Sequence, residues 1–253
     1  MGRLEITTHI GCPLNCLDCP QALLRRKYHG KRDMDFEEYK AAIDKVPTAV
    51  RIDFSGMCEP FCNEHCADMI LYAYEKGHPL ALYSTLQGAT MKDYERLKDV
   101  RYEVVTIHIP DNEERSHFNI TDEYLEVLAA WETNNYSCHG TVHNAVKPYL
   151  KQRNLITYMH DRAGNVEGRP HRFLDTTRPM WCLTSGRAMD HNVLLPDGTV
   201  LMCCMDYGMT GVFGNLFKQS YEEVLNSEAA CRMRETLNWG ESICRHCTNA
   251  NLQ

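Results

Sequence analysis

The stretch "RLEITTHIGCPLNCLDCP", residues 3–20, joins a β-type run directly to a loop that carries three cysteines. Residues 3–10 are rich in apolar and β-branched side chains, which predicts a strand. Cys12, Cys16 and Cys19 follow within eight positions of one another. In parallel α/β sheets the chemistry lies on the loops after the carboxyl ends of the strands. We therefore expect the three thiols to face a site at that edge of a sheet.

The alternation of strand and helix continues along the first 160 residues. Further β-rich runs cover residues 50–56, 79–85, 102–109, 137–144 and 154–160, and amphipathic helical patterns lie between most of them. About six β–α units predict an α/β protein with a parallel sheet. A doubly wound sheet is an alternative that periodicity does not exclude.

The pattern changes after about residue 170. Two apolar runs flank Pro196-Asp197-Gly198 and predict a β-hairpin, and a capping box of Ser220 and Glu223 predicts a short helix. A final "ICRHC" comes near the end of the sequence. We expect a first domain over residues 1–170 and a small cysteine-rich extension, without a core of its own, over residues 171–253.

Composition narrows the class of protein. The net charge of −7 argues against nucleic acid as the main partner, and no apolar run approaches the length that crosses a bilayer. The first residues lack the apolar segment of a secretory signal, so we expect a cytoplasmic protein with no membrane partner. Thirteen cysteines, an odd number, then favour metal or cluster ligation over a disulfide framework.

Three thiolates on one loop match three irons of a cubane cluster, with the fourth iron open to another ligand. A zinc site is the alternative, and it would normally require a fourth protein ligand. Asp18 and His29 are the only local candidates for that position.

The C-x3-C-x2-C spacing after the first strand resembles the radical S-adenosylmethionine (SAM) superfamily. This resemblance implies a partial (β/α)6 TIM-like barrel and a [4Fe–4S] cluster on Cys12, Cys16 and Cys19. The open iron would chelate SAM, and one electron from a flavodoxin or ferredoxin would cleave it to a radical that abstracts hydrogen from substrate. The family usually has an aromatic residue before the third cysteine, whereas this chain has Asp18.

Four further segments match the family in the same order. "FSGMCEP" (54–60) resembles its glycine-rich cofactor segment, "STLQG" (84–88) its ribose contact, "HIPD" (108–111) a fourth-strand contact, and "DRAGN" (161–165) an arginine segment. Arg162 would suit a carboxylate, because guanidinium groups make bidentate contacts. By this resemblance the cofactor-binding residues are Gly56, Met57, Cys58, Glu59, Thr85, His108 and Arg162.

A second cysteine constellation consists of Cys182, Cys203, Cys244 and Cys247. Alone, it also suits tetrahedral zinc. The segments "PDGTVLMCCMD", "VFGNLFKQSYEEVL" and "CRHC" are similar to the SPASM and Twitch extensions of radical SAM enzymes. The short Twitch form implies one auxiliary [4Fe–4S] cluster, with Cys203 rather than Cys204 as the ligand near the hairpin. The layout is similar to that of the inosamine dehydrogenases of aminoglycoside assembly.

The remaining thiols and several histidines are candidates for other roles. Cys58, Cys62 and Cys66 are spaced by four and either form a third metal site or are buried as small hydrophobic residues. Cys204 or Cys138 is a candidate hydrogen or proton donor to a substrate radical. The candidates for a deprotonating base, all placed at predicted strand ends, are His108, Asp111, His143 and His160.

Three classes of function follow from these patterns. We favour a radical SAM oxidoreductase that dehydrogenates a small alcohol or sugar-like molecule with the help of the auxiliary cluster. The alternative is a peptide-modifying radical enzyme, either an epimerase or a crosslinking maturase. The third class is a non-enzymatic zinc or iron–sulfur binding module.

Overall fold

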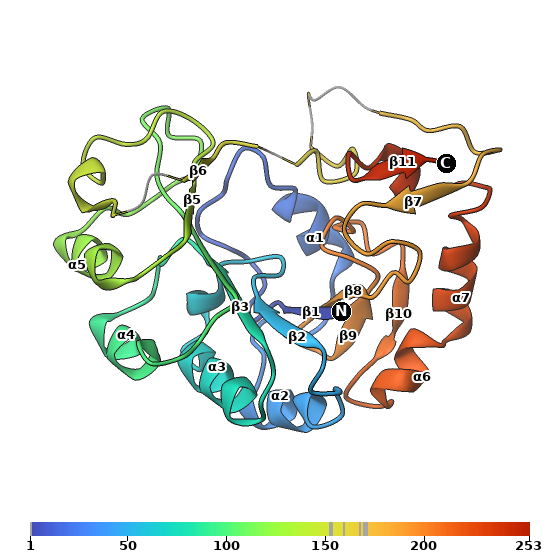
Figure 1. Cartoon of the computed structure of the whole chain (residues 1–253), viewed down its shortest axis with the longest axis horizontal. Helices are drawn as coiled ribbons and strands as arrows, with labels where there is room; N and C mark the ends of the chain where they lie inside the picture. The colour runs from blue at the N-terminus through green and yellow to red at the C-terminus, as the bar shows by residue number, and fades with distance from the viewer. Residues whose placement is uncertain (1, 152–153, 159, 167, 169–171) are drawn as a thin grey trace.

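The computed structural model describes residues 2–151, 154–158, 160–166, 168 and 172–253. Its main feature is a run of parallel strands that lie side by side in chain order (Figure 1). They are β1 (Arg3–Ile6), β2 (Arg51–Phe54), β3 (Leu80–Ser84), β4 (Val104–His108), β5 (Asn135–Ser137) and β6 (Leu155–Ile156). A doubly wound sheet reverses its strand order. Because the order of these six strands does not reverse, they do not form a doubly wound sheet by themselves.

Helices cover the outer side of these strands (Figure 1). They are α2 (Phe36–Ile43), α3 (Cys66–Glu75), α4 (Met91–Leu97) and α5 (Asp122–Ala130). Asp35, Thr90 and Thr121 each accept a hydrogen bond from a backbone N–H in the first turn of the helix that follows. A further helix, α1 (Gln21–Lys27), directly follows the cysteine loop and was not expected from the sequence.

The C-terminal part continues the same sheet. Strand β8 (His191–Leu194) pairs parallel with β1, and β9 (Thr199–Leu201) and β10 (Val212–Asn215) follow antiparallel. The resulting order is β10-β9-β8-β1-β2-β3-β4-β5-β6. The α/β class with a large, mostly parallel sheet is therefore confirmed. Strands from before and after residue 170 belong to this one sheet. The division into two domains at that residue stays a prediction.

Smaller elements complete the extension. The predicted turn at Pro196-Asp197-Gly198 joins β8 to β9, and the predicted capping box opens α6 (Tyr221–Leu225). Helix α7 (Glu228–Glu235) follows, and β7 (Met180–Cys182) pairs with β11 (Ala250–Leu252). The 3-10 turn η3 (Ile243–His246) also lies in the extension, whereas η1 (Pro60–Cys62) and η2 (Lys147–Tyr149) lie in connections of the first part of the chain.

One hydrophobic cluster spans both parts of the chain. It includes Leu4 and Ile52 from the parallel strands as well as Leu194 and Phe213 from the C-terminal strands. The extension thus packs on the same core as the first six strands. One expected strand is misplaced: β5 covers Asn135–Ser137, whereas residues 138–144 form an irregular loop with one isolated bridge at Val142.

In the described part of the chain, no helix combines the length and apolar character needed to cross a membrane.

Candidate active site

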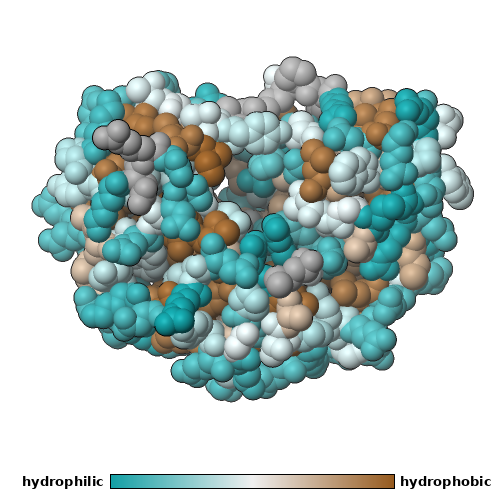
Figure 2. All heavy atoms as spheres, viewed as in Figure 1, coloured by the Kyte–Doolittle hydropathy of each residue, from teal (hydrophilic) through white to brown (hydrophobic). Residues whose placement is uncertain are grey.

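A cavity of about 450 Å³ lies where the parallel strands end. The space-filling view, drawn from the same side as Figure 1, shows a hollow near the middle of the surface (Figure 2). Residues from β1 to β6, from the cysteine loop and from the C-terminal extension line the cavity. The structure therefore places the site at the edge of the sheet that the sequence predicted.

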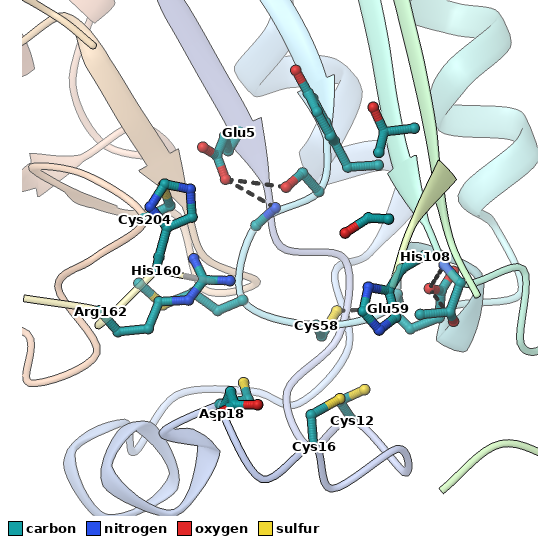
Figure 3. Close-up of a pocket in the computed structure, with 18 of the residues that line it drawn as sticks. Glu5, Cys12, Cys16, Asp18, Cys58, Glu59, His108, His160, Arg162 and Cys204 are labelled. Atoms are coloured by element: carbon teal, nitrogen blue, oxygen red, sulfur yellow. Dashed lines mark hydrogen bonds between the residues drawn. The ribbon is translucent and has the colours of Figure 1, made fainter. Parts of the chain in front are cut away.

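Cys12, Cys16 and Cys19 all line this cavity, as expected. Figure 3 shows Cys12 and Cys16 side by side on their loop. Backbone hydrogen bonds fix their loop against residues 115–117, with Leu17 N–H donating to Arg115 O at 2.8 Å and His117 N–H to Leu14 O at 2.7 Å. Burial raises the pKa of Cys12 to about 11 and that of Cys16 to about 12. These thiols are therefore protonated at neutral pH and would release protons on binding a metal.

Asp18, which replaces the expected aromatic residue, also lines the cavity. Its carboxylate accepts hydrogen bonds from Arg115 Nη2 at 2.8 Å and Nε at 3.3 Å. This forked contact joins the cysteine loop to the loop after β4. His29, the other local candidate for a fourth zinc ligand, is exposed and lies outside the cavity lining.

The loop after β2 brings Gly56, Met57 and Cys58 to the cavity wall. Gly56 has φ +65°, and a Cβ there would lie 2.4 Å from Thr7 Oγ1 and 2.9 Å from the backbone O of Ile6. Only glycine fits this close approach. Gly56 N–H donates to Glu5 Oε2 at 3.2 Å, and Met57 N–H donates to Thr7 Oγ1 at 3.1 Å. The loop is therefore pinned directly onto β1.

Glu59 joins two of the predicted cofactor segments. Its carboxylate accepts hydrogen bonds from Ser84 Oγ, Thr85 N–H and Thr85 Oγ1, each at 2.6 Å, and from Phe61 N–H at 3.2 Å. Burial raises the pKa of Glu59, although these hydrogen bonds act in the opposite direction. Glu59 and Thr85 both line the cavity, so the structure brings the two predicted contacts together.

His108 and Arg162 face the cavity from opposite sides (Figure 3). Burial, with a smaller effect from His139, lowers the pKa of His108 to about 3, so its imidazole is neutral. Burial also lowers the pKa of Arg162, but Tyr207 and Cys204 more than offset this, and the net shift is upward. Arg162 therefore presents a permanent positive charge, with its guanidinium carbon 5.8 Å from the centre of the Tyr207 ring.

The other base candidates separate into two groups. His160 lines the cavity, and burial lowers its pKa. Asp111 and His143 do not line it. Asp111 is buried beside the loop after β4 and accepts from the Arg115 backbone N–H at 3.1 Å, while His143 Nδ1 accepts from Ala145 N–H at 3.2 Å. The structure thus does not bring Asp111 or His143 to the site.

The second cysteine constellation lines a smaller neighbouring cavity. Cys182, Cys203, Cys244 and Cys247 all contribute to its wall together with apolar residues such as Leu237 and Ile243. Burial raises the pKa of Cys244 to about 12, that of Cys247 to about 11, and that of Cys203 well above its usual value. Backbone N–H groups donate to Cys182 Sγ and Cys247 Sγ, each at 3.4 Å. Four thiols around one cavity, two of which accept such bonds, fit an iron–sulfur cluster.

Cys203 and Cys204 differ in what they face. Cys203 lines the smaller cavity and not the larger one, and Cys244 is one of the charges that act on its pKa. Cys204 lines both cavities, and the charges that act most strongly on its pKa are those of Glu5 and Arg162. This arrangement favours Cys203 as the ligand and leaves Cys204 facing the larger cavity.

The spare thiols take separate positions. Cys58 lines the larger cavity, Cys62 is half-buried and Cys66 is buried in α3. Across the described ranges of the chain, these three do not form a group with all sulfur atoms within 4.8 Å of one another. Cys138 is buried with its Sγ 3.3 Å from Gly140 O and does not line the cavity, and Cys231 is exposed.

Sequence reasoning missed several residues of the site, namely Glu5, His139, His191 and Tyr207. Glu5 carried one signal, because it is the only charged residue among the buried positions of the first strand. The other three lie on loops or at a strand start, where no spacing rule marks them.

Residues 182–248 match one protein family, described as SPASM, an iron–sulfur cluster-binding domain. No curated protein matches the chain significantly. Among solved structures, BtrN in complex with AdoMet and 2-DOIA is similar to the chain, with a TM-score of 0.68 and 18% identity over 98% of this chain and 93% of that one.

Two further structures are similar over the same length. SuiB of Streptococcus suis bound to the precursor peptide SuiA has a TM-score of 0.61 and 11% identity over 97% of this chain and 69% of that one. The protein anSMEcpe with bound AdoMet and Cp18Cys peptide has a TM-score of 0.58 and 14% identity over 98% of this chain and 87% of that one. Residues 182–248 therefore match the SPASM iron–sulfur cluster-binding domain, and the chain is similar in fold to these three structures.

Proposed function

We propose that this protein is a radical SAM enzyme that oxidises a small alcohol or sugar-like substrate. The main support is that the three thiols and the predicted SAM contacts line one cavity. They are Cys12, Cys16 and Cys19 together with the Gly56–Glu59 loop, Thr85, His108 and Arg162. When bound, the [4Fe–4S] cluster would supply the electron that cleaves SAM, so that a hydrogen atom is abstracted from substrate. A flavodoxin or ferredoxin is the proposed electron donor.

The chain's own residues would bind and orient SAM. The tight approach of Gly56 to β1 holds residues 56–58 at the cavity wall, and we expect backbone carbonyl groups of this segment to accept from the amino group of SAM. Glu59 faces the same space, and the charged Arg162 suits a carboxylate. The larger cavity thus offers groups of both signs for an amino acid moiety.

We further propose that residues 1–170 form a partial (β/α)6 barrel and residues 171–253 a Twitch extension. Cys182, Cys203, Cys244 and Cys247 would hold one auxiliary [4Fe–4S] cluster. Their position beside the larger cavity supports this, since Thr184, His191, Cys204, Met205 and Asn249 line both cavities. A second cluster so close is well placed to accept an electron during a two-electron oxidation.

A small-molecule substrate is supported by the polar side chains that the strands present to the cavity. Ser55, Tyr83, Thr106 and Ser137 add hydroxyl groups to the carboxylates of Glu5 and Asp53. Hydroxyl and carboxylate groups match a substrate with several hydroxyls. The structure of BtrN contains the small molecule 2-DOIA, and its length is close to that of this chain.

A peptide substrate is the second candidate. Ile156 of the edge strand β6 and Tyr158 line the cavity and are 41% and 56% exposed. An exposed apolar edge beside a cavity suits an extended peptide, which would add to the sheet as a strand. SuiB and anSMEcpe are both similar in fold, and both have structures with bound peptide.

Anaerobic reconstitution with iron and sulfide tests this function. We expect dithionite-reduced protein to convert SAM to 5′-deoxyadenosine, and the Cys12→Ala/Cys16→Ala/Cys19→Ala variant to lose this activity while the auxiliary cluster remains. Cys231→Ser, an exposed thiol in α7, is the matched control and should retain activity. Protein that contains zinc in place of iron, or that releases no deoxyadenosine, would contradict the proposal.

A further inference from the structure

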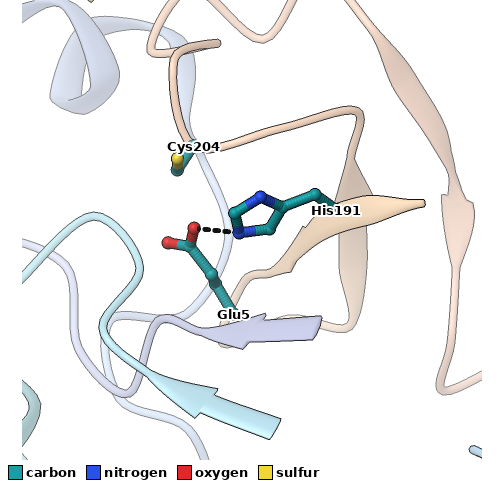
Figure 4. Close-up of side chains that lie close together, drawn as sticks. All are labelled: Glu5, His191 and Cys204. Carbon is teal, nitrogen blue, oxygen red and sulfur yellow. Dashed lines mark ion pairs between the residues drawn. The ribbon is translucent and has the colours of Figure 1, made fainter. Parts of the chain in front are cut away.

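Glu5, His191 and Cys204 meet at the boundary between the two cavities (Figure 4). Glu5 lies on β1, His191 begins the neighbouring strand β8, and Cys204 follows β9. All three line the larger cavity, and His191 and Cys204 also line the smaller one. The proposed SAM contacts and cluster ligands use none of these three side chains.

The three side chains bring their ligand atoms within 4.8 Å of one another. His191 Nε2 lies 2.7 Å from Glu5 Oε1, with the side chains 12% and 6% exposed. Nε2 is buried, and its contact with Glu5 is an ion pair only when the imidazole carries a proton on Nε2. Either a proton on Nε2 or a bound cation must lie between two such acceptor atoms.

The orientation of Glu5 is fixed by its second oxygen. Oε2 accepts hydrogen bonds from Ser55 Oγ at 3.3 Å and from Gly56 N–H at 3.2 Å. Such hydrogen bonds to one oxygen of a carboxylate, here Oε2, fix the position of the other oxygen, Oε1, so that it can bind a metal. Burial raises the pKa of Glu5, but His191, Cys204 and Arg162 outweigh it, and the net pKa lies below its usual value. The carboxylate is therefore ionised.

We propose that Glu5, His191 and Cys204 bind one zinc-type divalent cation. An oxygen, a nitrogen and a sulfur ligand form a donor set that suits zinc. Binding releases the thiol proton of Cys204 to solvent, and the carboxylate and thiolate then balance the two charges of the ion. The nearby positive charge of Arg162 therefore faces a neutral centre rather than a bare cation.

The fourth position of a tetrahedral ion would open into the larger cavity, which all three ligands line. Three protein ligands with one open position are typical of catalytic rather than structural zinc. In the part of the inference that rests on the proposed function, a hydroxyl oxygen of an alcohol substrate takes this position. The cation would hold that hydroxyl and lower its pKa.

Zinc analysis of the reconstituted holoenzyme tests the site. Protein with both clusters loaded is freed of loosely bound metal with a chelator and then given one equivalent of Zn²⁺. We expect about one zinc beside about eight irons per chain, the number for two [4Fe–4S] clusters. The zinc absorption edge should show one sulfur neighbour at about 2.3 Å together with nitrogen or oxygen neighbours.

Variants locate the ion. His191→Ala and Cys204→Ser should lose at least about nine-tenths of the zinc and keep the iron, because each removes one of only three protein ligands. His143→Ala and Cys231→Ser remove the same residue types outside the site and should keep both metals. Glu5→Gln should also lose zinc. If Glu5→Gln fails to fold, His191→Ala and Cys204→Ser decide the result.

Three results would overturn the inference. The first is wild-type protein that has its full iron content but retains no zinc. The second is zinc that has only sulfur neighbours. The third is loss of iron in Cys204→Ser, because that result would make Cys204 a cluster ligand. Failure of the proposed function is a separate outcome. In that case zinc is retained as expected, whereas reduced protein does not cleave SAM.

Discussion

Replacing Gly56 by alanine should disrupt both the fold and the proposed SAM site. The residue has φ +65°, a conformation that costs an alanine about 1–2 kcal/mol. The new Cβ would also lie 2.4 Å from Thr7 Oγ1 and 2.9 Å from Ile6 O. Relieving a collision with backbone costs about a further 1–3 kcal/mol. The total loss of stability is therefore about 2–5 kcal/mol.

Gly77→Ala is the matched control. Gly77 has φ +85°, but a Cβ there meets nothing within 4 Å, and the residue lies before β3, away from the cavity. It should lose only the conformational part, about 1–2 kcal/mol. In a domain of this size each kcal/mol lowers the melting temperature by about 2–4 °C. Gly56→Ala should therefore melt about 2–12 °C below Gly77→Ala.

The assay compares the two reconstituted variants at one heating rate and measures 5′-deoxyadenosine release from SAM. Displacement of the loop that carries Met57 and Glu59 should reduce release more than about tenfold in Gly56→Ala, equivalent to about 1.4 kcal/mol. Gly77→Ala should keep wild-type release. Equal melting temperatures and equal release in the two variants would refute the argument from close packing at Gly56.

Three other predictions concern the thiols and His108. Cys203→Ser should lose about half of the iron, because it removes a ligand of the auxiliary cluster, whereas Cys204→Ser should keep all of the iron. If an iron assay gives the reverse result, Cys204 rather than Cys203 is the ligand. Metal-free protein should lose stability as the pH rises from about 9 to 12, because the folded state holds the Cys16 proton to about pH 12 whereas the unfolded chain releases it near pH 9. Denaturation against pH should show a weaker loss in Cys16→Ser, and an unchanged profile would contradict the assigned burial. His108→Gln should leave the pH profile of activity between pH 5 and 8 unchanged, because the pKa of His108 is lowered to about 3; a shifted limb in that range would make His108 the titrating group.

The cysteine positions could be predicted because their signal is local. The spacing of Cys12, Cys16 and Cys19 directly after a strand indicates both the ligand type and the edge of the sheet, and the structure places all three on the cavity wall. The six parallel strands were predictable for a similar reason, since strand and helix alternate with clear periodicity.

The residues that the sequence did not reveal depend on long-range pairing. His191 reaches Glu5 only because β8 pairs with β1, and no local pattern predicts that neighbour. The same pairing brings the extension onto the common core, although the sequence suggested an appendage without one. His139 was assigned to a strand, whereas it lies in the turn after β5 and faces Asp18 and His108.

The central claim is that the cluster on Cys12, Cys16 and Cys19 leaves one iron open to SAM. The most direct measurement is the electron paramagnetic resonance spectrum of a reduced Cys182→Ala/Cys203→Ala/Cys244→Ala/Cys247→Ala variant, which would retain only this cluster. The account predicts a [4Fe–4S] signal that changes when SAM is added. A signal that SAM leaves unchanged, or protein without any iron–sulfur signal, would contradict it.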